Sequence, residues 1–292
     1  MSRSSRIAKG IREAHDRVAG EYGLRPIDGF IDAASYDSWN LQNNVIAPLS
    51  CLLAGHLLGG TVLETGCGNG QISEIVLESG VARVVGVDFS EAMLTGAVQR
   101  MRRAGLSHRF SPLRADLDNL DMIKRDSFDA AVLFGVLEHL DHPDQVIANV
   151  LHTIRPGGIF IVAVPRKYSL SHLSFLVFGE SPNRWGKKSF FYDRFRWREK
   201  SQYYRFFSRK DIQAIMSRCP AHTIVGRTGF AHVHLDGTPG WILRWLGRHP
   251  PWGHRALSRL EKLTRGVGFI PAGEYWVLRK ENQSAGKSPG ES

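Results

Sequence analysis

A glycine-rich segment flanked by carboxylates is the part of this sequence best suited to holding a ligand. Gly66-Cys-Gly-Asn-Gly70 follows the apolar run Thr61–Leu63, and Glu64 stands just ahead of it. Glycine lets a chain turn sharply between a strand and a helix and lets a ligand sit directly against the backbone. Asp88 ends a second apolar run, where a carboxylate can accept hydrogen bonds from both ribose hydroxyls of an adenosine. The pattern predicts a nucleoside-binding edge.

The glycine spacing separates this loop from dinucleotide-binding loops. It is Gly-x-Gly-x-Gly, whereas dinucleotide enzymes carry Gly-x-Gly-x-x-Gly. A glycine loop by itself is a weak signal. The alternative is a tight turn with a surface aspartate, and it requires the loop, Glu64 and Asp88 to coincide by chance.

Alternating apolar runs and helical patterns supply the frame for this edge. The strands are expected at residues 61–63, 84–87, 109–113, 128–134, 159–164, 223–230 and 274–278. Ser90 is a candidate N-cap, Pro143 suits a first helical turn, and Ser208–Asp211 resembles a capping box. Pro156–Gly158 is expected to turn the chain. Strands alternating with helices predict a mostly parallel sheet covered on both faces.

Composition places the chain among ordinary globular proteins. The 292 residues are 42% hydrophobic and 23% charged, and three distant cysteines form neither a disulfide framework nor a zinc pattern. This cysteine usage fits a reducing compartment. The first residues lead into no apolar signal core, and the longest apolar stretch, Val45–Leu58, is interrupted and too short to cross a bilayer. We therefore expect a cytoplasmic protein.

The formal net charge of +10 has two readings. One is solubility alone. The other is an anionic partner, which is a nucleic acid, a membrane surface or a phosphorylated substrate. Charge does not choose among them.

Six short motifs together resemble the class I methyltransferases that use S-adenosylmethionine (SAM), in particular the branch that includes the ubiquinone O-methyltransferases. The resemblance covers about residues 60 to 165. Its motifs are Glu64–Gly70, Val87–Ser90, Ala115–Leu117, Phe128-Asp129, Val136–Leu140 and Arg155–Gly158. It implies a Rossmann-like, doubly wound α/β fold. The sheet would have seven mostly parallel strands, an antiparallel last strand, and insertions after the fifth and sixth strands.

The resemblance also implies SAM as cofactor and a role for individual residues. The glycine loop would contact the methionyl part, Glu64 would reach the ammonium group through water, and Asp88 would hold the ribose hydroxyls. Phe89, Asp116 and Leu117 would surround the adenine, and the backbone near Phe134 would border the amino-acid end. The implied cofactor-binding residues are Glu64, Gly66, Cys67, Gly68, Gly70, Asp88, Phe89, Asp116, Leu117 and Phe134.

His139 is the candidate catalytic residue. It follows the fourth strand, at the edge where ligands bind in open α/β sheets, and an imidazole can take a proton from a substrate hydroxyl. The alternative is that His139 packs in the turn before Pro143. Methyl transfer can also proceed without a base, by alignment of the acceptor in a site closed to water. No Asp/His cluster has metal spacing, so no metal is predicted.

The substrate determinants are expected outside the common core. Tyr36 and Trp39 precede the first strand, and Trp185 and Phe191 belong to an aromatic and basic segment that follows the fifth. The expected organisation is an N-terminal helical cover (1–59), the SAM-binding core (60–165), a lid (166–207), the end of the sheet (208–280) and a disordered tail (281–292). Within the fourth region, residues 231–272 are basic and amphipathic, as in helices that lie on anionic membranes, but helices packed on a core look the same.

Three functions compete at this stage. The first is methylation of a hydroxyl on a small or lipid-linked acceptor, with peripheral membrane contact left open. The second is methylation of a nucleic acid, which the net charge favours. Against it, the fourth strand runs into Phe134–His139 and lacks the Asn/Asp-Pro-Pro-aromatic signature of enzymes that methylate base amino groups. The third is a SAM-binding scaffold without catalysis, disfavoured by the intact loop and carboxylates. No obligate protein partner is inferred.

Overall fold

The computed structural model of the protein describes residues 59–169, 172, 205–220, 222–230, 259, 271 and 273–282. In chain order the elements are β1 (Thr61–Thr65), α4 (Gln71–Glu78), β2 (Arg83–Asp88), α5 (Glu91–Arg103), the 3-10 turn η3 (Ser107–Arg109), β3 (Phe110–Arg114), β4 (Phe128–Leu133), the 3-10 turn η4 (Leu137–His139), α6 (Pro143–Thr153), β5 (Ile154–Pro165), α9 (Arg209–Met216), β6 (His222–Phe230) and β7 (Gly273–Lys280).

The described strands form one seven-stranded sheet in the order β3-β2-β1-β4-β5-β7-β6. The first five of these are parallel, and β7 runs antiparallel to both β5 and β6. This confirms the predicted fold class. The carboxyl ends of β1, β2, β4 and β5 therefore meet at one edge, which also holds the start of β7.

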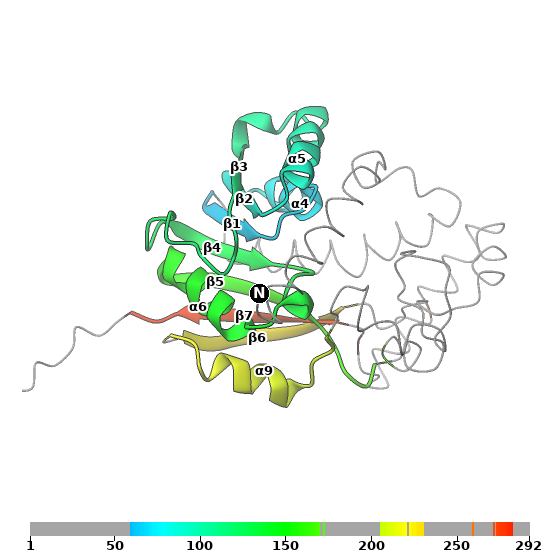
Figure 1. The fold of residues 1–292 in the computed structure, drawn as a ribbon, viewed down its shortest axis with the longest axis vertical. Helices are drawn as coiled ribbons and strands as arrows, with labels where there is room; N and C mark the ends of the chain where they lie inside the picture. The colour runs from blue at the N-terminus through cyan, green and yellow to red at the C-terminus, as the bar shows by residue number, and fades with distance from the viewer. Residues whose placement is uncertain are drawn as a thin grey trace, which may run out of the picture.

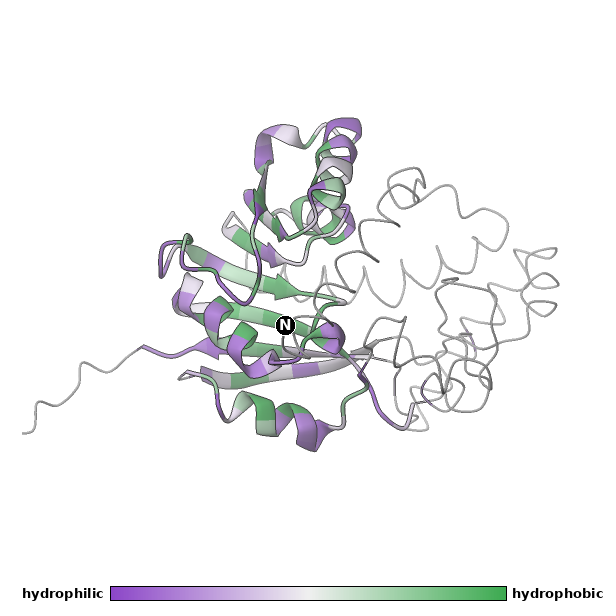
Figure 2. Cartoon of the chain, viewed as in Figure 1, coloured by the Kyte–Doolittle hydropathy of each residue, from purple (hydrophilic) through white to green (hydrophobic). Residues whose placement is uncertain are grey.

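Two apolar layers sandwich the sheet. Alternate residues of β5 point to opposite layers: Phe160 and Val162 join the layer shared with α6 and α9, whereas Ile161 joins the layer shared with α4 and α5. Figure 1 shows α4 and α5 beside β1–β3, and α6 and α9 beside β5–β7. In Figure 2 the apolar residues concentrate on the strands, as burial on both faces requires.

The predicted helix starts are confirmed. The Ser90 hydroxyl accepts a hydrogen bond from the Met93 amide at 3.3 Å, and Pro143 lies in the first turn of α6. Before α9, Ser208 and Asp211 form a reciprocal capping box, with the Asp211 carboxylate accepting from the Ser208 amide at 2.8 Å. These local contacts fix where α5, α6 and α9 begin.

Most strand boundaries differ from the expectation by one or two residues, and the start of β5 differs most. We expected a turn at Pro156–Gly158, but β5 already begins at Ile154 and includes these residues. The pairing of β4 with β5 shifts register between Phe128 and Ala130, and Gly157 has a φ of +78°. The glycine therefore produces an irregularity within a strand, because backbone pairing with β4 continues on both sides of it.

Candidate functional site

The glycine loop joins β1 to α4 and lies against the end of β2. The amides of Gly66 and Cys67 both donate to the carbonyl of Val87, at 2.8 and 2.9 Å. Gly66 has a φ of +70°, and a Cβ built on it would lie 2.3 Å from Cγ2 of Val136. Glycine is thus required here by backbone conformation and by the approach of the chain that follows β4.

The other two glycines serve the same turn. Gly68 (φ +50°) faces open space, whereas Gly70 (φ +78°) is the N-cap of α4, and a Cβ on it would lie 3.0 Å from that of Ala97. The Gly70 amide closes the turn by donating to the Cys67 carbonyl at 2.9 Å. At its three glycines the loop therefore presents backbone without side chains at the edge of the sheet.

Asp88 ties the end of β2 to the glycine loop. Its Oδ2 accepts from the Gly68 amide and its Oδ1 from the Ser90 amide, each at 2.9 Å. The Asp88 carbonyl accepts from the Ala115 amide at 3.1 Å, which brings the chain after β3 to the same place. Asp88 is buried, with 8% of the residue exposed. Two backbone N–H donors thus fix the orientation of its carboxylate.

Glu64 places a second carboxyl group beneath the loop. It is buried in β1, and the Ser73 hydroxyl of α4 donates to its Oε2. Burial raises the pKa of Glu64 to about 8, and the negative charge of Asp88 adds to this rise. Burial also raises the pKa of the Cys67 thiol. Because a cation near Glu64 would reverse much of this shift, the site favours a positively charged ligand group.

Phe89, Asp116 and Leu117 lie on the loops that follow β2 and β3. Leu117 is buried, and Phe89 and Asp116 are half-buried. The Asp116 Oδ1 accepts from the Asp118 amide at 3.2 Å. The side-chain amide of Asn149, on α6, donates through Nδ2 to the Leu117 carbonyl at 3.2 Å, which holds this loop in place.

The turn after β4 carries Phe134, Glu138 and His139. The Phe134 ring lies 6.2 Å from the ring of Tyr275, measured between centroids. Glu138 is buried, and its Oε2 has no hydrogen-bond partner among the described residues. Burial raises the pKa of Glu138, and the neighbouring His139 partly offsets this rise. His139 is half-buried on η4. Glu138 precedes the predicted base in the chain, but no sequence pattern indicated that its carboxyl group is buried.

Sequence reasoning missed a charged cluster at the end of β5. Arg166 follows this strand directly, and its Nη1 lies 3.2 Å from Oε2 of Glu274. Arg209, the first residue of α9, contacts the other oxygen of Glu274 at 2.9 Å. The available signal was that Arg166 follows one apolar strand run and that Glu274 begins another. Nothing local in the sequence indicated that these two residues pair.

The four predicted substrate residues, Tyr36, Trp39, Trp185 and Phe191, lie outside the described residues. So do nearly all of the predicted lid and of the basic amphipathic segment 231–272. Their predicted contacts with the acceptor or with a membrane stay predictions. Within the described ranges, no three His, Cys, Asp or Glu side chains come together in a way that could hold a metal ion. No helix in that part of the chain is long and apolar enough to cross a membrane.

Comparison with known proteins places this arrangement in a family. A family model described as a methyltransferase domain matches residues 62–158. This part of the chain is a class I SAM-dependent methyltransferase domain. The match covers the glycine loop, Asp88, Asp116 and the turn that carries His139. SAM is the cofactor of this family, in agreement with the prediction.

Curated relatives share the methyltransferase domain. The chain is 32% identical over 149 residues to a probable SAM-dependent methyltransferase of Mycolicibacterium smegmatis, which covers 51% of this chain and 52% of that protein. It is 32% identical over 112 residues to the ubiquinone biosynthesis O-methyltransferase of Pseudomonas fluorescens, covering 38% and 47%. The chain thus spans about half the length of the curated relatives it matches.

Solved structures share the fold of the methyltransferase domain. A 1,6-didemethyltoxoflavin N1-methyltransferase of Burkholderia thailandensis, with S-adenosylhomocysteine bound, aligns with a TM-score of 0.58 and 17% identity over 97% of this chain and 92% of that one. The [4+2]-cyclase SpnF aligns with a TM-score of 0.52 and 20% identity over 80% and 81%. Because a cyclase has this fold too, the fold alone does not decide the reaction.

Proposed function

We propose that the protein transfers a methyl group from SAM to a hydroxyl oxygen of a small or lipid-linked acceptor. The observation that carries this proposal is the Asp88 carboxylate, held at the end of β2 by the Gly68 and Ser90 amides at 2.9 Å and facing a bare glycine loop. The buried carboxyl of Glu64 lies on the strand that leads into the same loop. Two acidic groups around bare backbone suit a cationic nucleoside.

The residues present fit SAM. Asp88 would hold the ribose hydroxyls, and Glu64 the ammonium group. Gly66 leaves room at the point where a side chain would meet Val136. Asp116 and Leu117, on the loop fixed by Asn149, would border the adenine. SAM supplies a methyl carbon that its sulfonium makes electrophilic.

The chain's own residues would contribute orientation and a proton acceptor. His139 lies at the edge formed by the ends of β1, β4 and β5, and its imidazole would take the proton from the acceptor hydroxyl. Phe134, packed against Tyr275, would border the methionyl end. Relatives named as ubiquinone biosynthesis O-methyltransferases support oxygen as the methylated atom and a lipid-linked acceptor.

The first test is cofactor binding measured by calorimetric titration. Wild-type protein should bind SAM and its demethylated product at micromolar strength. Asp88→Ala should weaken both by about 2–4 kcal/mol, because two hydrogen bonds to a charged acceptor are lost. Asp121→Ala, which removes an exposed carboxylate that belongs neither to the glycine loop nor to β2, should leave binding unchanged. Absence of SAM binding, or binding of NADH in its place, would contradict the proposal.

The second test identifies the acceptor. Purified protein is incubated with methyl-labelled SAM and separate extracts of polar metabolites, lipids and RNA, with Asp88→Ala as the inactive control. We expect label in the lipid or polar fraction, in alkali-stable form, as an ether should be. Label confined to RNA would replace this function with nucleic-acid methylation. SAM binding without label in any fraction would favour a non-catalytic scaffold.

A further inference from the structure

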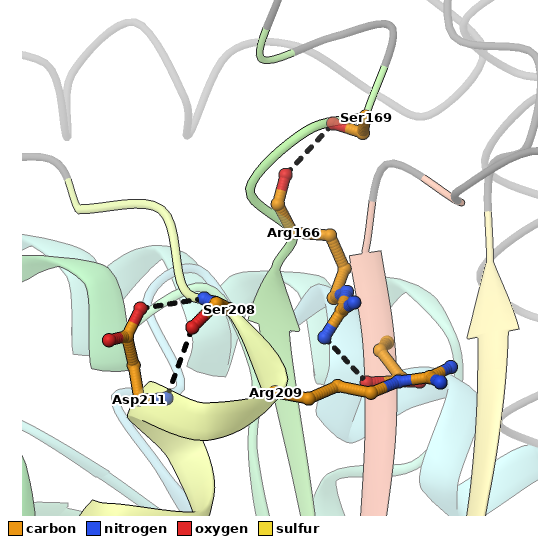
Figure 3. A network of polar contacts seen from close by, with 6 residues as sticks. Arg166, Ser169, Ser208, Arg209 and Asp211 are labelled. Carbon is orange, nitrogen blue, oxygen red and sulfur yellow. Dashed lines mark hydrogen bonds and ion pairs between the residues drawn. The ribbon is translucent and has the colours of Figure 1, made fainter.

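Two arginines from distant parts of the chain share one carboxylate at the edge of the sheet where β5 ends and β7 begins. Nη1 of Arg166 donates to Oε2 of Glu274 at 3.2 Å. Nε and Nη2 of Arg209 both donate to Oε1 of Glu274, at 3.2 and 2.9 Å. Figure 3 shows the Arg166 and Arg209 side chains converging at the start of β7. Both oxygens of Glu274 are therefore occupied.

Arg166 is buried but incompletely satisfied. Its side chain is 8% exposed and that of Glu274 is 3% exposed, whereas Arg209 is 54% exposed. Nε of Arg166 is buried and has no hydrogen-bond partner among the described residues. A charged donor that loses water and gains no acceptor is costly, and such groups are rare in native proteins. A guanidinium can bind a carboxylate or phosphate in a bidentate manner, so its Nε side suits an anion.

The charges around Arg166 do not balance. Glu274 is one negative charge between two guanidinium groups. Lys167 is already paired with Asp211 at 3.0 Å, so this acid is engaged elsewhere. Burial lowers the pKa of Arg166, Glu274 opposes this shift, and the positive charges of Arg209 and Arg227 add to it. The net charge of Arg166, Arg209 and Glu274 is therefore positive, and a second anion at Arg166 would be attracted by it.

The cluster adjoins the predicted catalytic turn. Arg166 forms a β-bridge with Phe207, two residues after Arg205. The Arg205 amide donates to the Glu138 carbonyl at 3.0 Å, and Glu138 precedes His139 on η4. The segment 205–207 therefore runs between the turn that carries His139 and the strand end that carries Arg166. The cofactor loop follows β1 at the same edge, because β1, β4 and β5 are parallel.

We propose that Arg166, with Arg209 and Glu274, forms a binding site for an anionic group, a carboxylate or a phosphate, on the methyl acceptor. Only the identification of the ligand as the methyl acceptor rests on the proposed function; the anion site itself does not. Arg166 provides the Nε side of its guanidinium, Glu274 holds the opposite side, and Arg209 keeps the local charge positive. Because Nε of Arg166 is buried, anion binding requires the side chains around it to rearrange.

The test observes Arg166 directly and needs no turnover. Protein labelled with 15N-arginine is titrated with benzoate and, separately, with inorganic phosphate at constant ionic strength, with chloride as the reference anion. The Nε–H signal of Arg166 is identified by its loss in Arg166→Lys. We expect this signal to shift saturably with millimolar benzoate or phosphate but not with chloride. The anion that binds identifies the chemical class.

Variants make the assignment specific. Anion binding, measured by calorimetry, should weaken at least tenfold in Arg166→Lys. This variant keeps a positive charge for Glu274 but loses the planar N–H donors of the guanidinium group. It should weaken about threefold to fivefold in Arg209→Gln, which leaves Arg166 in place. Arg218→Lys, at an exposed pair with Asp144, is the matched control and should bind like wild type.

SAM binding is measured on the same samples. A protein that binds SAM but shows no saturable anion shift refutes the anion site and leaves the proposed function standing. A protein that binds the anion but not SAM refutes the proposed function and leaves the anion site standing. Equal anion binding in Arg166→Lys and wild type would show that Arg166 and Glu274 form only a structural ion pair between β5 and β7.

Discussion

The two halves of the sheet satisfy their buried polar groups in different ways. Around β1 and β2, Asp88 accepts from Gly68 and Ser90, and Glu64 accepts from Ser73. Three buried side-chain atoms lack a partner among the described residues, and all belong to the other half, after β4, after β5 or on β7: Glu138 Oε2, Arg166 Nε and Trp276 Nε1. In the first half the two buried carboxyl groups are thus held by backbone and side-chain donors. In the second half a buried carboxyl oxygen and two buried N–H groups are left without a partner, and the anion site proposed above uses one of them.

The largest expected effect tests how tightly the first half is preformed. Gly66→Ala puts a Cβ 2.3 Å from Val136 in a left-handed conformation. It should lower the free energy of unfolding by about 2–5 kcal/mol, the sum of backbone strain and overpacking. Gly68→Ala is the matched control, because its Cβ meets nothing and only strain of about 1–2 kcal/mol applies. Denaturant unfolding of both variants measures the difference. An equal loss in the free energy of unfolding for both variants would mean that the Val136 side chain moves away from the new Cβ at no cost.

The second prediction concerns the turn between the halves. If His139 is the base, His139→Ala should lower turnover about a hundredfold, while SAM affinity stays within about twofold. His142→Ala removes an exposed imidazole from the same connection and serves as the control. Turnover is measured with methyl-labelled SAM once the acceptor fraction is known. Undiminished turnover in His139→Ala would assign this side chain to packing.

The first half could be predicted from the sequence because its contacts lie within and between recognisable motifs. Asp88 and Gly68 are 20 positions apart, yet each ends or follows an apolar run. The cluster in the second half had no such signal. Arg166 and Glu274 are 108 positions apart, and the pair forms only because β7 inserts beside β5. In the sequence, Arg166 is only the first position of the predicted lid (166–207), and no role is predicted for it.

Local rules also misplaced one strand start. Pro156-Gly157-Gly158 has turn composition, and the expected strand therefore began at residue 159. Ile154 nevertheless pairs with Phe128 of β4, so β5 begins there, while residues 155–158 have no partner in the β4 register, which resumes at Ile159. Tertiary pairing overrides local propensity in strands more readily than in helices. The predicted helix starts, which depend on caps only three residues long, were confirmed.

The third prediction uses the raised pKa of Glu64, about 8 in the empty protein. Below this pH the buried carboxyl is protonated, and an ammonium group beside it would favour the ionised form. SAM binding at pH 7 should therefore release up to one proton, and SAM affinity should rise with pH up to about 8 and then level off. Calorimetry in two buffers of different ionisation enthalpy counts the protons.

Glu64→Gln checks that the proton comes from this residue. Proton release should disappear in the variant, and its SAM affinity should no longer depend on pH in this range. Without ligand, a carboxyl whose folded pKa is raised makes the wild type lose stability as pH rises from about 4.5 to 8, and the variant should lack this slope. Proton release that persists in Glu64→Gln would point to another group.

The smallest expected effect separates positioning from surface charge. Arg100 donates through Nε to the Asn69 carbonyl at 3.1 Å and through Nη1 to Glu74 at 3.0 Å, with side-chain exposures of 14% and 18% for the ion pair. Arg100→Met keeps most of the side chain's length but frees the loop carbonyl, and it should cost about 1–2 kcal/mol of stability and weaken SAM binding severalfold.

Arg218 and Asp144, 3.6 Å apart with exposures of 70% and 31%, form the comparison pair in the other half, and Arg218→Met should cost under about 0.5 kcal/mol with no change in SAM affinity. Thermal unfolding and calorimetric titration of the two variants measure both quantities. If Arg100→Met loses stability without losing SAM affinity, the glycine loop keeps its shape without this contact, and the backbone bonds to Val87 together with Asp88 are sufficient to hold it.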